Sequence, residues 1–445
     1  MSTITETAAT TLKLSGNPVR ALKVKPNRLI NTIHETAKFG AKFKWGPLET
    51  DTGVCRLALS DEDKKVKDWF VNEVKSLGCK VKIDQIGNIF AIFPGQNNDA
   101  KPTAMGSHLD TQPTGGRYDG IYGVLSGLEV LRTLKDNNYV PKYPIVLINW
   151  MNEEGARFPL SIMASSVWSG AFKLEDIYKV ESVTDETPVT VEHELKRIGY
   201  LGDTPASYEA MPLAAHFEIH IEQGPILEAE NKKIGVVEGV QAYTWWRIKV
   251  TGKAQHTGTT PLALRNDPLL ATSQMIVKAN EIAKKHDGLA SIGILNLGPG
   301  VVNVIPDEVS FALDMRNVKD EVLNKMIEEF KKEFTEITKA TGSKINVEFE
   351  HLHTQPATHF NKTCIKCVED SALELFGADQ YRKITSGAGH DSCSTATRCP
   401  TSMIFIPSKD GVSHNPEEYS TPEQVDEGFR VLLSAVLKYD QLRTE

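Results

Sequence analysis

The segment from Thr244 to Glu350 constrains the fold of this chain most, because its strand-like and helix-like stretches follow an order that is complete in itself. The pattern predicts strands at 245–251, 291–297, 308–315 and 344–349, and helices at 267–286 and 319–340. The resulting order, βαββαβ, is that of a ferredoxin-like unit. We therefore expect residues 244–357 to form a domain inserted into a larger one, which comprises residues 26–243 and 358–445.

The larger domain is expected to be α/β, because helix-period and strand-period stretches alternate along it. The pattern predicts a helix at 68–77 and strands at 80–84, 88–93, 103–107 and 145–150. Asp119 is placed to cap a further helix, whose apolar residues recur at helical spacing from Val124 to Leu134. The apolar run Ile145–Trp150 suits a central strand, so we predict a mostly parallel sheet flanked by helices.

The composition excludes several classes of partner. The formal charge of -8 is spread over 445 residues without long acidic or basic blocks, so we expect no nucleic acid. No apolar run reaches the roughly 20 residues that cross a bilayer, so we expect no membrane span. Residues 1–25 indicate a flexible arm without a secretory signal, and a cytoplasmic location follows. The six cysteines, Cys364 and Cys367 among them, are expected to be reduced and mostly buried.

Histidine and carboxylate residues gather at the predicted ends of strands, which is where ligands bind in open α/β sheets. These residues are His108 and Asp110 in GSHLD, Asp119 at the start of the next helix, Glu153 and Glu154 in NEEGARF, His390 in GAGHDS, and His414 in GVSHNPEE. Each cluster alone is weak, but five clusters bounded by glycines favour convergence. The sequence therefore predicts a metal site of a hydrolase.

The segment HFEIHIEQGP (216–225) contains two histidines four residues apart, which could share a helix face. Strict alternation of apolar and polar residues indicates instead a half-buried strand, closed by Gly224 and Pro225. His220 is nearer than His216 to the carboxyl end of that strand, and it is therefore the better ligand candidate.

Six longer stretches carry a resemblance to a known family: GSHLDTQP, YDGIYGVLSGLEVLR, NEEGARF, HIEQGPILE, GAGHDSC and PSKDGVSHN. From about Arg28 to Tyr439 the chain resembles the N-carbamoyl amino acid amidohydrolase branch of the zinc aminoacylase and carboxypeptidase-like metallopeptidase superfamily. Within that branch it is most similar to the β-alanine synthases (β-ureidopropionases) of yeasts. The resemblance implies hydrolysis of the carbamoyl C–N bond of N-carbamoyl-β-alanine, as in pyrimidine catabolism, by a homodimer joined through residues 244–357.

The same resemblance implies a set of metal ligands. His108, Asp119 and His220 would hold one zinc ion, while Asp119, Glu154 and His414 would hold the second. Such ligands also suit Mn²⁺ and other divalent ions. Two further residues complete this set: the Asp110 carboxylate would accept the other ring N–H of His108, and Glu153 would be the general base.

For the substrate, the resemblance implies a bridge between the two domains. His256 would donate to the oxyanion, in its own active site or in the partner's. Arg316 would bind the substrate carboxylate, with Asn303, Gln223 and His390 as polar helpers. The alternative for Arg316 is an ordinary surface ion pair with Asp314 or Asp307.

The chain departs from the family pattern at two positions: Thr257 and Ala164 stand where the family usually has alanine and glycine. If the glycine has a positive φ, Ala164 would distort the loop near the metals. Other substrates therefore stay open, among them allantoate, N-carbamoyl-α-amino acids and dipeptides. A catalytically inactive paralogue is a further alternative, but Glu153 and all five ligand positions are present.

Overall fold

The computed structural model describes residues 22–444, so most of the predicted arm, residues 1–25, lies outside the described residues. The chain forms two compact units. The first comprises residues up to Gly239 together with His359 onward, and the second comprises Val240–Thr358. The second unit thus interrupts the first in sequence, with bounds a few residues from the predicted range of 244–357.

A nine-stranded sheet forms the centre of the first unit. Its four middle strands are parallel neighbours, in the order β17 (Thr401–Ile406), β7 (Ala215–Ile221), β5 (Thr103–His108) and β6 (Ile145–Trp150). The outer strands are β8 (Ile234–Val240), β15 (Thr358–His359) and β16 (Tyr381–Ser386) at one side, and β4 (Ile89–Phe93) and β3 (Lys80–Ile83) at the other. Of these, β8, β4 and β3 run antiparallel to their neighbours. The predicted α/β fold, with a mostly parallel central sheet flanked by helices, is confirmed.

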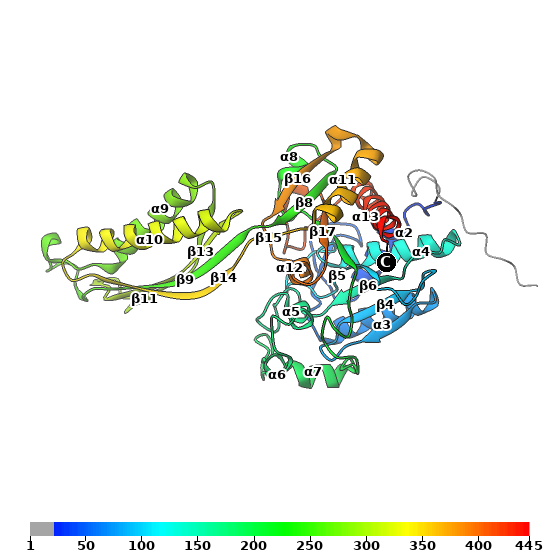
Figure 1. Ribbon diagram of the computed structural model, residues 1–445. Helices are drawn as coiled ribbons and strands as arrows, with labels where there is room; N and C mark the ends of the chain where they lie inside the picture. The colour runs from blue at the N-terminus through cyan, green and yellow to red at the C-terminus, as the bar shows by residue number, and fades with distance from the viewer. Residues whose placement is uncertain (1–21, 445) are drawn as a thin grey trace, which may run out of the picture. The chain divides into compact units, whose positions relative to one another are not determined.

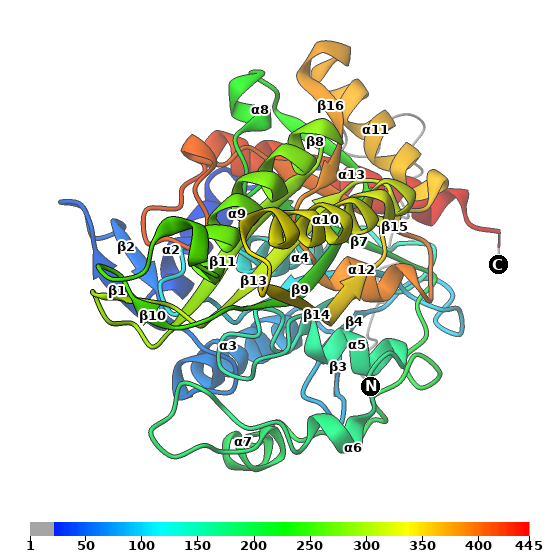
Figure 2. The same ribbon diagram turned by 90° about the vertical axis from the view of Figure 1, so that its left-hand side faces the viewer.

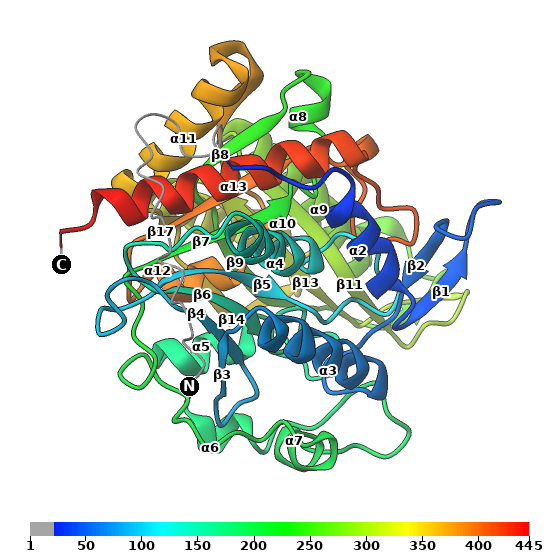
Figure 3. The same ribbon diagram turned by 90° about the vertical axis from the view of Figure 1, so that its right-hand side faces the viewer.

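Helices cover both faces of that sheet (Figure 3). On one face, α4 (Ile121–Asp136) and α13 (Pro422–Leu442) pack side by side, with α2 (Arg28–Ala37) against both. On the other face, Trp168 of α5 (Met163–Ser169) packs edge-on against Trp150 of β6, and α12 (Asp391–Ala396) lies next to α5. The remaining helices are α3 (Asp61–Ser76), α6 (Leu174–Ile177), α7 (Val191–Ile198), α8 (Ile226–Ala229) and α11 (Lys362–Phe376).

Three local predictions for this unit need correction. The helix predicted at 68–77 begins at Asp61, because Ser60 caps it by accepting the backbone N–H of Asp63. Asp119 does not cap α4: Gly120 is the N-cap residue, and the helix has no side-chain cap. Strand β7 is buried along its whole length rather than half-buried, because α12 packs on its polar face.

The second unit has the predicted βαββαβ order and forms a four-stranded antiparallel sheet (Figure 1). The strand order is β11 (Leu289–Gly298), β13 (Glu308–Asn317), β9 (Ala242–Thr251) and β14 (Asn346–Gln355). Helices α9 (Pro268–Lys285) and α10 (Asp320–Thr341) lie side by side on one face (Figure 2). Alternate residues of β13 are buried beneath them, so the apolar core lies between helices and sheet. The ferredoxin-like unit is confirmed.

Short elements complete the described chain. They are the paired strands β1 (Ala41–Lys44) and β2 (Thr52–Val54), the paired strands β10 (Gln255–His256) and β12 (Val304–Ile305), and three single 3₁₀ turns at Leu262–Leu264, Ala378–Gln380 and Lys409–Gly411. All six cysteines are free, and all but Cys55 are buried, as predicted. Within residues 22–444, no helix is both long enough and apolar enough to span a bilayer.

Candidate metal centre

The predicted ligands converge at one edge of the central sheet, because the four parallel strands all end there. His108 is the last residue of β5, and Glu153 and Glu154 follow β6. His220 lies one residue before the end of β7, and His414 is in the loop after β17. Parallel neighbours bring their carboxyl ends to the same side of a sheet, so residues far apart in sequence meet there.

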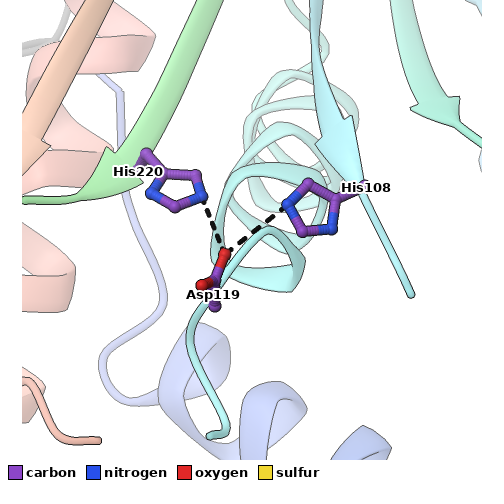
Figure 4. A group of neighbouring side chains, drawn as sticks. All are labelled: His108, Asp119 and His220. Carbon is purple, nitrogen blue, oxygen red and sulfur yellow. Dashed lines mark ion pairs between the residues drawn. The ribbon is translucent and has the colours of Figure 1, made fainter. Parts of the chain in front are cut away.

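The first group of ligand atoms belongs to His108, Asp119 and His220, all three of them buried (Figure 4). Oδ1 of Asp119 lies 3.1 Å from Nε2 of His220 and 3.5 Å from Nε2 of His108. Gly120 makes this approach possible, because a Cβ there would lie 2.2 Å from Cε1 of the His108 ring. Gly120 also has a φ of +67°, which disfavours any side chain.

The second group of ligand atoms shares Asp119 with the first. Nε2 of His414 lies 3.3 Å from Oδ2 of Asp119 and 3.4 Å from Oε2 of Glu154. The ligand atoms of each group lie within 4.8 Å of one another. The two oxygens of Asp119 therefore face different groups, which is the arrangement that lets one carboxylate bridge two ions.

The buried histidines are held with Nε2 toward the cluster. Nδ1 of His220 lies 2.9 Å from the backbone oxygen of Ile221, and Nδ1 of His108 lies 2.9 Å from that of Asp110. An N–H at Nδ1 donating to a carbonyl leaves Nε2 as a free lone pair for a metal. The hydrogen bond predicted from His108 to the Asp110 carboxylate does not form. The carbonyl oxygen of Asp110 lies next to Nδ1 of His108 instead, and the carboxylate lies 4.0 Å from that nitrogen. The Asp110 carboxylate instead accepts the backbone N–H groups of Glu153 and Glu154, at 3.3 and 3.2 Å.

Buried negative charge accumulates around these histidines. Oε2 of Glu153 lies 3.6 Å from Nε2 of His108. Burial raises the pKa of Glu153 well above its ordinary value, and burial next to Asp119 raises that of Glu154 to about 7. Burial alone would raise the pKa of Asp119, but hydrogen bonding to the three histidines holds this pKa well below its usual range. Among the described residues, the ion-pair partners of these three carboxylates are histidines, with no lysine or arginine.

This donor set fits divalent cations. Imidazole Nε2 atoms and carboxylate oxygens are ligands that Zn²⁺, Mn²⁺ and similar ions accept. Buried carboxylates without a lysine or arginine need a cation from elsewhere. The residues present can therefore hold two ions that share Asp119, and the ions would stabilise the charged carboxylates that burial disfavours.

Two predicted substrate residues also lie at this centre. Nε2 of Gln223 donates to Oδ2 of Asp119 at 2.9 Å and lies 3.4 Å from Nε2 of His414. The ring of His390 packs 4.7 Å from that of His220, and its Nε2 lies 3.0 Å from Oγ of Ser386. The structure thus brings both residues to the ligands, and substrate binding by either stays a prediction.

The other predicted substrate residues belong to the second unit. Nδ1 of His256 accepts the backbone N–H groups of Gly258 and Thr259, at 3.0 and 3.2 Å. The neutral ring therefore carries its proton on Nε2, which suits a donor to an oxyanion. Asn303 lies nearby, since its backbone oxygen accepts the N–H of Thr257 at 3.0 Å.

Arg316 lies on β13, on the sheet face that the helices leave open. Its Nη2 and Nε donate to the Asp314 carboxylate, at 2.8 Å to Oδ2 and 3.1 Å to Oδ1. Its guanidinium also lies over the ring of Tyr243, 5.2 Å from the centroid. The ion pair with Asp314, which was the alternative interpretation of Arg316, is thus present. A substrate carboxylate would compete with Asp314 for the guanidinium of Arg316.

Comparison with known proteins agrees with this geometry. Residues 104–438 match peptidase family M20/M25/M40. The chain belongs to this family. It is 37% identical over 418 residues to an N-carbamoyl-L-amino-acid amidohydrolase of Rhizobium meliloti, covering 94% of this chain and 97% of the relative. It is 30% identical over 422 residues to an allantoate amidohydrolase of Bacillus subtilis (strain 168), covering 94% and 98%.

A solved structure shows the same fold over nearly the whole chain. An amidase of the hydantoinase/carbamoylase family from Burkholderia multivorans has a TM-score of 0.86 and 42% sequence identity, covering 94% of this chain and 98% of that one. The cluster around Asp119 thus belongs to a member of a hydrolase family.

The two departures from the family pattern prove harmless to the backbone. Ala164 lies inside helix α5 and has no positive φ, so the condition under which it would distort the loop is not met. Its carbonyl oxygen accepts from Nδ2 of Asn88 at 3.3 Å. The backbone of Thr257 is hydrogen-bonded at both ends, to Asn303 and to Nη2 of Arg265.

Sequence reasoning missed two residues of the candidate metal centre, Ser413 and Glu418. Oγ of Ser413 lies 3.1 Å from Oδ2 of Asp119, and Glu418 is 2% exposed and accepts the backbone N–H of Asp119 at 3.0 Å. Both residues belong to the stretch GVSHNPEE, in which His414 was recognised. The second acidic residue at the end of that stretch was the feature of the sequence that could have indicated Glu418.

The preference for His220 over His216 depends on where the strand ends. His216 is also completely buried, but Oγ of Ser392 and Oγ1 of Thr395 lie 3.4 and 3.3 Å from its Nδ1. Burial lowers the pKa of His216 to about 3. His216 is thus a neutral core residue on the same face of β7 as the candidate ligand His220, four positions before it.

Proposed function

We propose that this chain is a metal-dependent amidohydrolase that removes the carbamoyl group from an N-carbamoyl amino acid. The observation that carries the proposal is the pair of ligand groups that share Asp119, with the Glu153 carboxylate beside His108. The names of the relatives supply the class of bond, since they act on N-carbamoyl-L-amino acids and allantoate. Two zinc ions are the proposed cofactors, and Mn²⁺ would fit the same ligands.

Glu153 has the position of the general base in this proposal. The ions, when bound, supply Lewis acidity and bring the pKa of a water molecule close to neutral. Glu153 accepts the proton of the attacking water and delivers it to the leaving nitrogen, so one carboxylate serves both halves of the reaction. Its burial keeps bulk water away from the proton while it is transferred.

The second unit supplies the groups that recognise the substrate. Arg316 can form two parallel charge-assisted hydrogen bonds to a carboxylate, as it already does with Asp314. The Nε2–H of His256 would donate to the oxyanion that develops on the ureido carbon, whether in its own chain or in the partner. Asn303 is the proposed polar helper beside His256.

The finer proposal is N-carbamoyl-β-alanine as the substrate, and its support is the likeness of six sequence motifs to yeast β-alanine synthases. N-carbamoyl-L-α-amino acids and allantoate are the competing substrates, and the relatives' names favour them. N-carbamoyl-β-alanine has one more methylene group between its carboxylate and its ureido group than either competitor. The position of the fork that binds the carboxylate must therefore separate it from them.

The direct test measures ammonia release from N-carbamoyl-β-alanine, N-carbamoyl-L-α-amino acids and allantoate, and the release of free amino acids from dipeptides. We expect hydrolysis of at least one N-carbamoyl acid, and loss of that activity with a chelator. Arg316→Lys should lower kcat/KM for it by about 10- to 100-fold, because a point charge does not reproduce the fork. Arg247→Lys, an exposed arginine on β9 paired with Glu350, is the matched control. Cleavage of dipeptides alone, or an unchanged kcat/KM in Arg316→Lys, would contradict the assignment.

We further propose that the chain forms a homodimer through the second unit. Edge strand β11 exposes four large apolar residues, which are Leu289, Ile294, Leu295 and Leu297. The opposite edge strand, β14, exposes Leu352 among charged and polar residues. An apolar edge with unpaired backbone groups favours pairing with a second copy.

Light scattering coupled to size exclusion tests this interface. We expect the parent protein to have the mass of two chains, and Ile294→Lys to have the mass of one, because the lysine charge would be buried in the interface. Leu352→Lys makes the same change at the other edge and should leave the dimer intact. A parent monomer at assay concentration, or a dimer that Ile294→Lys leaves unaltered, would refute the proposal.

A further inference from the structure

Glu418 lies directly behind the ligand that both metal groups share. Its Oε1 accepts the backbone N–H groups of Tyr118 and Asp119, at 3.0 Å each. Its Oε2 lies 2.9 Å from Oγ of Ser413, the residue before the ligand His414. One buried carboxylate thus joins the loop that carries Asp119 to the loop that carries His414.

The Glu418 side chain has room here only because the residues that lie against it and its loop are glycines. A Cβ on Gly116 would lie 2.3 Å from Cβ of Glu418, which no real contact permits. A Cβ on Gly53 of strand β2 would lie 2.8 Å from Cα of Pro416. A side chain at Gly116 would therefore push the loop of Asp119 away from Glu418, and one at Gly53 would push β2 away from the loop of His414.

Ser413 gives the carboxylate a second role. Its hydroxyl has one proton and two acceptors within reach, Oε2 of Glu418 at 2.9 Å and Oδ2 of Asp119 at 3.1 Å. If the proton goes to Glu418, Oδ2 of Asp119 accepts from Gln223 but not from Ser413, and one more lone pair stays available for an ion. A neutral residue that no longer accepts this proton would turn the hydroxyl toward Asp119.

We propose that Glu418 is a positioning residue for both metal ions, acting through the backbone of Asp119 and the hydroxyl of Ser413. It does not touch substrate in this scheme. The inference rests on the proposed metal-dependent function, but it concerns the affinity for the ions rather than turnover.

The test measures dissociation constants for zinc by competition with a chromogenic chelator, in the full chain. In Glu418→Gln, the amide can still accept the two N–H groups but no longer accepts the Ser413 proton. We expect both dissociation constants to rise about 10- to 100-fold, as is typical when a partner of a ligand is lost. Both should rise, because Asp119 belongs to both groups.

Glu417→Gln is the matched control, because it removes the same charge from the neighbouring, exposed glutamate. Its constants should equal those of the parent. Ser413→Ala leaves the Glu418 carboxylate on the two N–H groups, so the loss of one hydrogen bond should cost less than about fivefold. Melting of the metal-free proteins checks the fold, and we expect Glu418→Gln to melt within a few degrees of the parent.

The proposal is overturned if Glu418→Gln binds both ions as tightly as the parent, or if one ion alone is weakened. It is also overturned if Ser413→Ala has as large an effect as Glu418→Gln, since the hydroxyl would then act without the carboxylate. Zinc affinity can be measured even in a chain that hydrolyses no N-carbamoyl acid. Failure of this inference is therefore distinct from failure of the proposed function.

Discussion

Glu153→Gln is expected to lower kcat by about 10²- to 10⁴-fold, the usual contribution of a general base, while the protein keeps its fold and metal content. A neutral amide has the same shape as the carboxylate but cannot take the proton of the attacking water. Oε2 of Glu153 lies 3.6 Å from Nε2 of His108, yet Glu153 belongs to neither ligand group, so both groups stay complete.

Steady-state kinetics on the best substrate of the panel would be combined with elemental analysis of the same preparation. Glu186→Gln, an exposed glutamate, is the control for loss of one negative charge. A kcat within tenfold of the parent value would remove Glu153 from the mechanism. Loss of metal together with activity would instead make Glu153 a ligand, which also contradicts the assignment.

Asp119→Asn is expected to remove both metal ions, whereas His414→Ala is expected to remove one. The reason is that Asp119 presents Oδ1 to His108 and His220 and Oδ2 to His414. The amide replaces one oxygen by a donor and removes the charge that offsets the ions. Since His414 belongs to the second group alone, its loss leaves the first group complete.

Elemental analysis after dialysis gives the metal content of each variant, with about two ions per chain expected in the parent. We expect Asp119→Asn to bind close to none and to be inactive, and added zinc should not restore it at concentrations that saturate the parent. Two tightly bound ions in Asp119→Asn would show that the groups do not share this carboxylate, and none in His414→Ala would contradict the expectation that the first group stays complete.

Local patterns in the sequence determined much of the architecture. The strands at 80–83, 103–108 and 145–150, and all six elements of the second unit, follow from alternation and helical spacing, since these periods report which residues share a face. The strand ends then indicated where the candidate ligands meet, because the parallel strands β5, β6 and β7 bring their carboxyl ends together. His220 could be preferred over His216 on that ground alone.

The tertiary structure decided what covers each face and which partner each polar group finds. Strand β7 alternates like a half-buried strand, but α12, which comes about 170 residues later, buries its polar side and makes His216 a core residue. Periodicity cannot report this, because it does not say whether another layer lies above a face.

The same limit explains the partners around the metal centre. The backbone oxygen of Asp110, not its carboxylate, holds His108, and Asp314 occupies the fork of Arg316. Glu418 reaches Asp119 across 299 positions of sequence. Side-chain chemistry in the sequence showed which groups can bind a metal or a carboxylate, whereas the partner that each group contacts depended on loops that meet only in the folded chain.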